Sequence, residues 1–378
     1  MRDSLNFIDV KILEGLAKYG PRNMSKLARE LGVPRGTVLS RINRMSSSFY
    51  LRLNAIVCHT NLGMKRAFVF TKATLGEEDL LFRCMKAHNF YVYVNRCYGT
   101  FEGCMAIYNI PEDHITKFEH FLLELEKSGV AKDIKVYWST CSKPVNWTTN
   151  WFDSHSETWI FPWDKWIGEI PSKRSELPYT LRDPESFSLM ADETDVFLIK
   201  ELEKDATTSL AAIARKLGTT LQNVRYHYVT HVLRNRLIQA FQVSIYPYEI
   251  RNPCMLYFLF DFDDEKKMAK FAQSLLDKPF VIGFSKVLEK TTLIVQLYLP
   301  RLEFRNFVDA LSKLVRTGLL RSYDYVNQDL RPGKWVRLTI PYELFKDGSW
   351  IYNHNEHIQS LHDLLKRSTE YEVELISE

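Results

Sequence analysis

The sequence predicts an α+β protein made of two tandem units, each a winged helix-turn-helix followed by a ferredoxin-like βαββαβ domain. Three observations support this prediction: two similar segments at a constant spacing, a basic three-helix pattern within each segment, and the same order of strands and helices after each. A chain of 378 residues with 46% hydrophobic composition can bury several cores.

The two similar segments lie 186 residues apart. IDVKILEGLAKYG, from Ile8, aligns with TDVFLIKELEKDA, from Thr194, and LARELGVPRGTVLSRI, from Leu27, aligns with IARKLGTTLQNVRYHY, from Ile213. The alignment needs no gap, so we interpret the chain as an internal duplication.

The first segment predicts a helix-turn-helix. Amphipathic spacing indicates a helix over 9–18, a second helix over 25–31 ended by Gly32, and a third helix that begins at Pro34. On the third helix Val38, Ile42 and Met45 share one face, which we expect to point to the core. The outward residues are then Arg35, Thr37, Ser40, Arg41 and Arg44. This is the composition of a recognition helix for the major groove of DNA.

The second segment predicts a second recognition helix. We interpret Thr219 and Gln222 as a capping box at its start, which leaves other polar residues for DNA contact. These candidates are Asn223, Arg225, Tyr226, Thr230 and Arg234. The charge of both segments supports DNA binding by two helix-turn-helix heads. Residues 22–52 include seven basic residues and one acidic residue, and residues 209–236 include five basic residues and no acidic residue. A solvated basic face on a three-helix bundle is the alternative for any single arginine.

Histidines and cysteines give little sign of metal or redox chemistry. His227 and His231 lie one helical turn apart, but two ligands without a third nearby make a weak site, so we expect no metal. His354, His357 and His362 are interpreted as surface residues. Six cysteines without a CxxC pair indicate free thiols.

Downstream of each helix-turn-helix, apolar patterns predict one connecting strand and then strand, helix, strand, strand, helix, strand. The expected elements are 53–60, 65–72, 77–88, two strands within 90–110, 112–128 and 133–140, and then 238–246, 254–261, 264–277, two strands within 280–299, 302–317 and 322–328. In such a domain two helices cover one face of a four-stranded sheet, and we expect the two uncovered faces to pack together.

Six of the eight tryptophans fall between Trp138 and Trp166. We interpret this segment, and the echo of Trp335, Phe345 and Trp350 near the end, as extensions packed on their own units; an exposed aromatic platform is the alternative. The polar, proline-bearing stretch 170–190 is the expected linker.

These patterns divide the chain into helix-turn-helix 1 (1–50), ferredoxin-like domain 1 (51–142), a Trp-rich extension and linker (143–190), helix-turn-helix 2 (191–236), ferredoxin-like domain 2 (237–330) and a C-terminal extension (331–378). The N-terminus lacks the pattern of a signal peptide and no long apolar run follows, so we expect a cytoplasmic protein that does not engage a membrane.

The segments FIDVKILEGLAKYG, LARELGVPRGTVLSRINRM and LNAIVCHTNLGMKRAFVF resemble the Lrp/AsnC (feast/famine) transcription regulators, with Asn61 to Met64 at that family's Leu-Gly-aromatic turn. The resemblance implies a regulator that binds double-stranded DNA and whose α/β domains mediate pairing and sense a small effector such as an amino acid. The effector turn of the family is matched by Tyr98, Gly99, Phe101 and Glu102. A simple hairpin turn is the alternative interpretation of Gly99. The second unit departs from the family pattern, since 285–290 contains Glu289 but no glycine, so the resemblance does not extend an effector site to that unit.

We therefore expect a sequence-specific regulator that forms a pseudo-dimer within one chain, and a homodimer of whole chains would present four heads. The two recognition helices differ in sequence, so we expect an asymmetric operator. We expect no cofactor and no enzymatic activity.

Two alternatives remain. Siroheme decarboxylases resemble this layout, sometimes as fused pairs, but their His-rich hairpin is matched here by YVYVNRCYGTFEG, which has Asn95, Arg96 and Tyr98 and no histidine. A regulator that acts mainly through protein partners is the other.

Overall fold

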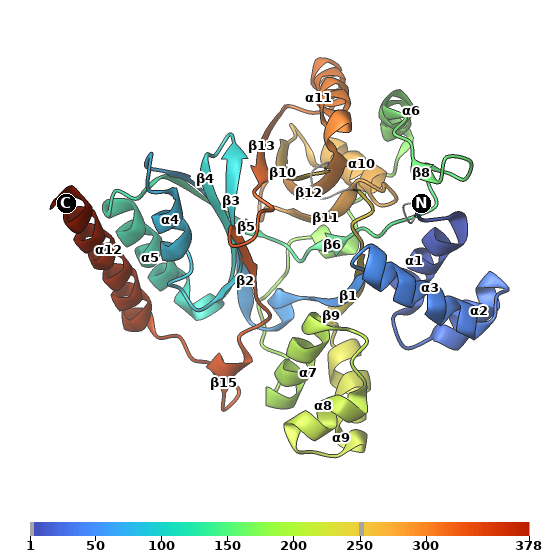
Figure 1. Cartoon of the computed structure of the whole chain (residues 1–378), viewed down its shortest axis with the longest axis horizontal. Helices are drawn as coiled ribbons and strands as arrows, with labels where there is room; N and C mark the ends of the chain where they lie inside the picture. The colour runs from blue at the N-terminus through green and yellow to red at the C-terminus, as the bar shows by residue number, and fades with distance from the viewer. Residues whose placement is uncertain (1–3, 249–252, 378) are drawn as a thin grey trace.

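The computed structural model describes residues 4–248 and 253–377. The remaining residues, 1–3, 249–252 and 378, belong to the predicted first head, second ferredoxin-like domain and C-terminal extension and lie outside the described residues. Two three-helix heads lie next to each other, one at the right and one at the bottom of Figure 1, beside a body of strands that is covered by helices on both sides.

The first head contains α1 (Phe7–Tyr19), α2 (Met24–Leu31) and α3 (Arg35–Ser48). A capping box begins α1: the Asn6 side chain accepts from the backbone N–H of Asp9, and the Asp9 carboxylate accepts from that of Asn6. Gly32 ends α2 in the left-handed conformation, with φ of 66°. Val38 and Met45 of α3 are fully buried, as their spacing predicts.

The second head contains α7 (Glu193–Lys204), α8 (Leu210–Leu217) and α9 (Leu221–Tyr226), which continues as a π-helical turn, η5 (His227–Leu233). The predicted capping box of Thr219 with Gln222 is wrong. The cap is the next residue, Thr220, whose hydroxyl accepts from the backbone N–H of Asn223 at 3.2 Å. The helix starts one residue later than predicted, with Thr220 in the extended backbone conformation of an N-cap.

One strand from each unit forms an antiparallel ribbon between the two heads. The strand β1 (Arg52–Val57) pairs with β9 (Ile238–Ser244), so that Arg52 lies opposite Ser244 and Ala55 opposite Phe241. The heads also touch directly, since Arg22 donates hydrogen bonds to two backbone carbonyls of the other head, at 3.1 and 2.8 Å.

Each unit then forms a ferredoxin-like domain. The first contains β2 (Met64–Ala73), α4 (Glu78–Cys84), β3 (Tyr91–Gly99), β4 (Gly103–Pro111), α5 (Ile115–Lys127) and β5 (Ala131–Ser139). The second contains β10 (Pro253–Asp261), α10 (Glu265–Leu275), β11 (Val281–Lys286), β12 (Thr292–Pro300), α11 (Arg301–Arg316) and β13 (Ser322–Gln328). The strand orders, β5-β2-β4-β3 and β13-β10-β12-β11, are equivalent. The predicted α+β fold, with a helix-turn-helix ahead of ferredoxin-like domains, is therefore confirmed.

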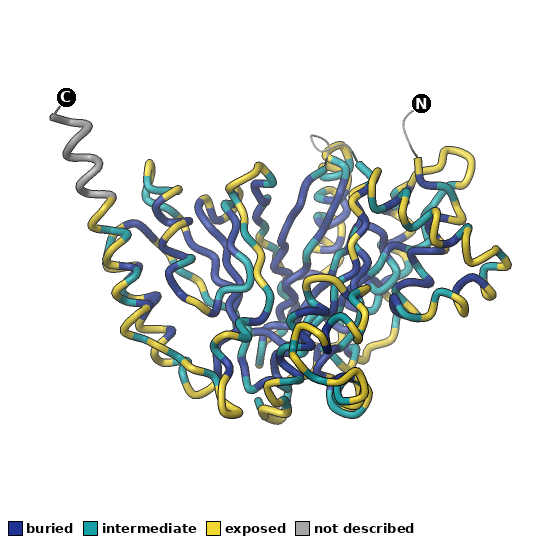
Figure 2. Tube along the Cα trace, turned by 60° about the horizontal axis from the view of Figure 1, so that its bottom comes forward, coloured by how far each residue is buried: buried dark blue, intermediate teal, exposed yellow. Residues whose placement is uncertain are grey.

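The two sheets join edge to edge. Strand β13 pairs with β3, placing Val326 opposite Gly99, and β11 pairs with the short β6 (Lys143–Pro144), which follows β5. The faces that carry no helices pack on each other through a shared aromatic and aliphatic core. It consists of Phe68, Phe70, Cys97, Phe101, Met105, Ile107, Tyr257, Leu259, Val287, Ile294 and Val326. Figure 2 shows the strands buried along most of their length, while the outer helices alternate between buried and exposed faces.

The extensions that follow each domain are exchanged between the units. Helix α6 (Trp163–Glu169) packs on α11, and Trp166 is fully buried in the core of the second domain. Helix α12 (His354–Ser377) packs on α4 and α5 of the first domain, where Leu361 is buried. The expectation that each extension packs on its own unit is therefore wrong for these two helices, each of which covers the other unit (Figure 1). Other parts of the extensions do pack on their own units, since Phe345 lies in the core of the second head.

Residues of the predicted linker are also packed. Ile170 and Leu181 are fully buried against the second domain, in short 3-10 turns at Ile170–Ser172 and Tyr179–Leu181. The rest of the extensions forms small hairpins, β7 (Phe152–Asp153) with β8 (Thr158–Trp159) and β15 (Phe345–Lys346) with β16 (Ser349–Trp350), and the edge strand β14 (Trp335–Arg337). Trp147 and Trp159 are buried against the first head, so the segment is no exposed platform.

Cys58 and Cys141 form a disulfide, which corrects the expectation that all six cysteines are free thiols. The fold brings the end of β1 beside the segment after β5, across 83 residues, a proximity that cysteine spacing does not indicate. The other four cysteines are buried and unpaired in the described residues.

Across residues 4–248 and 253–377, every helix is too short or too polar to cross a membrane.

Candidate functional site

The predicted recognition helix α3 presents a polar face to solvent. Arg35, Ser40 and Asn43 are exposed, while Thr37 is half-buried. A shallow hollow lies between this helix, the chain just before α1 and the hairpin that carries Glu157. It is lined by Ser4, Asn6, Gly36, Thr37, Ser40, Arg41, Arg44 and Glu157.

Arg41 and Arg44 have a second role within the head. Asp9 is fully buried, and both of its carboxylate oxygens face these guanidinium groups, with Arg41 Nη1 at 2.8 Å and Arg44 Nη2 at 2.5 Å. Arg41 also donates to the Asn6 side chain at 3.1 Å. The arginine side chains stay about 26% and 31% exposed. They join α3 to α1 and still reach the surface, so their positions are set before any ligand binds.

The face of α9 and η5 differs in character. Arg225, Tyr226 and Arg234 are exposed, whereas Asn223 and Thr230 are half-buried. Three exposed apolar side chains share this surface: Leu221, Val229 and Leu233. The two heads therefore present surfaces of different chemistry.

The four residues of the predicted effector turn lie where the two sheets join. Phe101 is buried in the shared core, and Glu102 is exposed. Gly99 has φ of 126°, and a Cβ there would be 2.7 Å from the carbonyl oxygen of Tyr325. The Tyr98 hydroxyl donates to an Asp329 carboxylate oxygen at 3.2 Å. The glycine at position 99 therefore permits the close approach of β13 to β3.

A separate polar cavity of about 160 Å³ lies between the β1–β9 ribbon and the facing sheets. Arg66 of β2, Arg337 of β14 and Glu203 of α7 line it, together with Tyr93 and Tyr257. Burial raises the pKa of Glu203 to about 7, although the backbone N–H of Ile340 donates to its carboxylate at 2.7 Å. Burial also lowers the pKa of Arg66 to about 10. Two cations around one carboxyl group make a site suited to a small anionic ligand.

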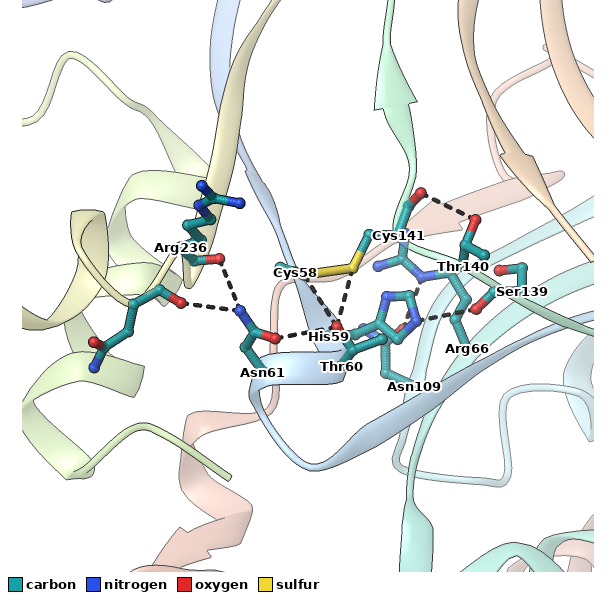
Figure 3. The surroundings of a disulfide bond; sticks show 11 residues. Cys58, His59, Thr60, Asn61, Arg66, Asn109, Ser139, Thr140, Cys141 and Arg236 are labelled. Atoms are coloured by element: carbon teal, nitrogen blue, oxygen red, sulfur yellow. Dashed lines mark hydrogen bonds between the residues drawn. A yellow bond between two sulfur atoms is a disulfide. The ribbon is translucent and has the colours of Figure 1, made fainter. Parts of the chain in front are cut away.

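Figure 3 shows how Arg66 is held near the disulfide. Its Nε donates to Asn109 Oδ1 at 2.9 Å on the neighbouring strand. Beside it, His59 Nε2 lies 3.3 Å from the Ser139 carbonyl oxygen, and burial lowers the pKa of His59 well below its ordinary value. The disulfide and these contacts fix the wall of the cavity.

Sequence patterns did not indicate this cavity. Its charged residues come from a strand of the first unit, a helix of the second head and the C-terminal extension, more than 100 residues apart in each case. Arg337 reaches Arg66 and Glu203 because the C-terminal extension crosses to the first unit. The four residues of the predicted effector turn are absent from the lining, as far as the described residues go.

Residues 5–46 match the model of the AsnC-type helix-turn-helix domain. This confirms the resemblance to Lrp/AsnC proteins, and the first head is an AsnC-type helix-turn-helix. A comparison with curated proteins found no match.

Solved structures show the same architecture over nearly the whole chain. The siroheme decarboxylase NirDL superposes with a TM-score of 0.54 at 12% identity, covering 96% of this chain and 99% of that one. NirDL in co-complex with an iron-uroporphyrin III analogue gives 0.51 at 13% identity, covering 94% and 98%. AsnC of E. coli matches 35% of this chain and 91% of its own, with a TM-score of 0.30 and 14% identity.

The comparison with NirDL corrects one expectation. We expected a protein without enzymatic activity, but an enzyme has this fold from end to end, so the helix-turn-helix layout does not separate regulators from enzymes.

Proposed function

We propose that this chain is a DNA-binding transcription regulator whose two heads contact an asymmetric operator. The observation that carries the proposal is the exposed polar face of α3 within an AsnC-type helix-turn-helix. A helix of this kind fits the major groove, where arginine donates to guanine and neighbouring side chains hold phosphates.

The arrangement of Arg41 and Arg44 supports this role. Their pairing with Asp9 holds the guanidinium groups in fixed positions, which reduces the conformational entropy lost when they contact DNA. The ribbon of β1 and β9 joins the two heads, so we expect them to bind as one unit. A homodimer would place four heads on one operator.

Effector sensing remains part of the proposal. The predicted turn of Tyr98, Gly99, Phe101 and Glu102 lies at the junction of the sheets, where a ligand could change how the two units sit on each other. Such a ligand alters DNA affinity only if it binds the two arrangements with different affinity.

The test is selection of genomic DNA fragments by the purified full-length protein, followed by fluorescence anisotropy on the selected site at several salt concentrations. Arg35→Ala and Ser40→Ala should weaken binding, with about 1–3 kcal/mol lost at a base-contacting arginine. Arg316→Ala, an exposed arginine at the end of α11 in the second ferredoxin-like domain and outside both heads, is the matched control. Selection that enriches no sequence, or equal binding by all three variants, would contradict the proposal.

A second candidate is an enzyme acting on a carboxylate-bearing substrate, as NirDL does with siroheme. The specific observation is the cavity with Arg66, Arg337 and Glu203, because guanidinium pairs bind carboxylates. At about 160 Å³ the cavity does not accommodate a tetrapyrrole as it stands, since ligand sites usually span roughly 300–1,000 Å³. Titration with siroheme, followed at the Soret band in the native protein and in Arg66→Gln and Arg337→Gln variants, tests this candidate.

A further inference from the structure

Four metal-ligating side chains meet in the second head. Asp192, Asp195, His227 and His231 place one ligand atom each within 4.8 Å of one another. His227 Nδ1 lies 2.9 Å from Asp195 Oδ1 and 3.6 Å from Asp192 Oδ2. His231 Nδ1 lies 3.0 Å from Asp195 Oδ2 and 3.9 Å from Asp192 Oδ2.

These separations suit a four-coordinate ion. Zinc binds imidazole nitrogen and carboxylate oxygen at about 2.0–2.2 Å, so the edge of its tetrahedron is about 3.4 Å. The four nitrogen–oxygen distances, 2.9 to 3.9 Å, fall on both sides of that value. Two carboxylates would also neutralise a divalent charge, and small side-chain rotations would bring all four atoms to bonding distance.

The backbone explains why the four side chains converge. The capping box at the start of α7 holds Asp192 and Asp195 together, with Asp195 buried and Asp192 half-exposed. The π-helical turn η5 begins at His227 and contains His231. Turns of this kind are rare and frequently occur at functional sites.

The first head serves as an internal comparison. At the duplication spacing of 186 residues, Asn6 corresponds to Asp192, Asp9 to Asp195 and Arg41 to His227. The π turn adds one residue, so His231 faces Asp195 as Arg44 faces Asp9, and the buried Val232 takes the place of Met45. The first head thus neutralises its aspartate with two permanent cations, whereas the second surrounds it with two imidazoles and a further carboxylate.

We propose that Asp192, Asp195, His227 and His231 form a binding site for one divalent transition-metal ion, of which zinc is the best match. Two nitrogen and two oxygen donors are borderline ligands suited to zinc, and less suited to calcium or magnesium, which prefer oxygen alone. Without metal, each imidazole donates its Nδ1–H to Asp195. Zinc would bind the Nδ1 lone pair of each ring, and each neutral imidazole would then carry its proton on Nε2.

The bound ion would join the start of α7 to the turn that follows α9. Tyr226, a predicted DNA contact, packs its ring against His231 with centroids 5.3 Å apart and against His227 at 5.7 Å. Metal binding therefore fixes the recognition helix of the second head. This effect on DNA rests on the proposed function, whereas the metal site itself does not.

The test uses full-length protein stripped with a chelator and titrated with Zn²⁺ by calorimetry, and with Co²⁺, whose visible d–d absorption reports four-coordinate binding. We expect one high-affinity equivalent in the native chain. His227→Gln and His231→Gln should each weaken Zn²⁺ binding at least about 100-fold, because even partners of ligands contribute about 10–100-fold. Asp192→Asn should weaken it while keeping the helix cap, since Asn caps as well as Asp.

His155→Gln, in the exposed hairpin between β7 and β8, is the matched control and should bind zinc as the native chain does. His354→Gln tests the other histidine pair, since His354 Nε2 lies 3.1 Å from His120 Nδ1. Absence of zinc binding in the native chain, or binding unchanged by His227→Gln and lost in His354→Gln, would overturn the site. DNA affinity measured with and without zinc is a separate readout, so failure of DNA binding leaves the metal result intact.

Discussion

The Asp9 carboxylate is fully buried and accepts a hydrogen bond from the Arg41 guanidinium at 2.8 Å, across the interface between α1 and α3. Arg44 supplies the second cation. A buried carboxylate is tolerated here only because both of its oxygens face cations. Substitutions within this buried pair should therefore cost more stability than substitutions within an exposed ion pair.

We expect Asp9→Ala to lower the free energy of unfolding by about 3–5 kcal/mol, because it leaves two half-buried guanidinium groups without their carboxylate. Urea denaturation followed by circular dichroism measures this. Lys72→Ala breaks an exposed pair with Asp133 and should cost less than about 1 kcal/mol. Equal losses of unfolding free energy in the two variants would show that the buried ion pair stabilises the fold no more than the exposed one does.

Arg41→Ala should affect both stability and DNA binding, whereas Arg35→Ala should affect DNA binding alone. The reason is that Arg41 holds Asp9 and Asn6, while Arg35 is exposed. The measurements are melting temperature and the salt dependence of DNA affinity, whose slope falls by about one for each phosphate that the variant no longer neutralises. A destabilised Arg35→Ala would contradict this division of roles.

Acid should loosen α12. His357 of this helix is buried, and its ring centroid lies 4.0 Å from that of the buried His88. Burial, helped by the positive potential of His354, lowers the pKa of His357 to about 4. The unfolded chain takes up a proton near pH 6.5 and the folded chain does not, so stability is complete above pH 6.5 and falls as the pH drops toward 4.

The expected loss from this one group is about 2 kcal/mol. Tryptophan fluorescence and limited proteolysis between pH 7.5 and 4.5 follow it, because Trp350 packs beside the same core. His357→Phe should flatten the pH profile, and His155→Gln should leave it unchanged. A profile that keeps its shape in His357→Phe would exclude this histidine as the cause.

The disulfide should add substantially to stability. Cys58 and Cys141 close a loop of 83 residues, for which chain entropy gives about 4.5 kcal/mol. A reductant should therefore lower the midpoint of urea unfolding of the native chain. The double variant Cys58→Ser, Cys141→Ser should start at the lower midpoint and show no further change with reductant; a further change would implicate other thiols.

Gly99→Ala should weaken the junction between the sheets. The positive φ and the carbonyl of Tyr325, 2.7 Å from the new Cβ, both oppose a side chain there. We expect a loss of about 1–3 kcal/mol. Gly129→Ala is the matched control, since Gly129 also has positive φ but an added Cβ meets nothing within 4 Å. Equal losses would mean that backbone strain alone, and not contact with β13, sets the cost.

Much of the fold follows from local patterns. The strands and helices of both ferredoxin-like domains lie within a few residues of their predicted bounds, because apolar periodicity and β-branched runs are local properties. Gly32 and Gly218 end their helices as expected, since a left-handed residue is needed there.

The site-forming contacts do not follow from local patterns. His227 and His231 were visible at ligand spacing, but the aspartates that face them come from a helix that begins 34 residues earlier. The sequence indicates a surface position for His357, which is wrong: the residue is buried because α12 crosses to the first domain. The disulfide and the Arg66–Glu203–Arg337 cavity likewise depend on how the two units cross each other.

The exchanged tails have a consequence for biosynthesis. The first ferredoxin-like domain leaves the ribosome long before α12, the helix that shields its outer layer, has been translated. Conversely, Trp163 and Trp166 emerge well ahead of the domain that receives them. Neither half of the molecule reaches its final packing until translation is almost complete, so a nonsense mutation near the last helix would leave an early-made domain with its hydrophobic side uncovered and open to proteolysis.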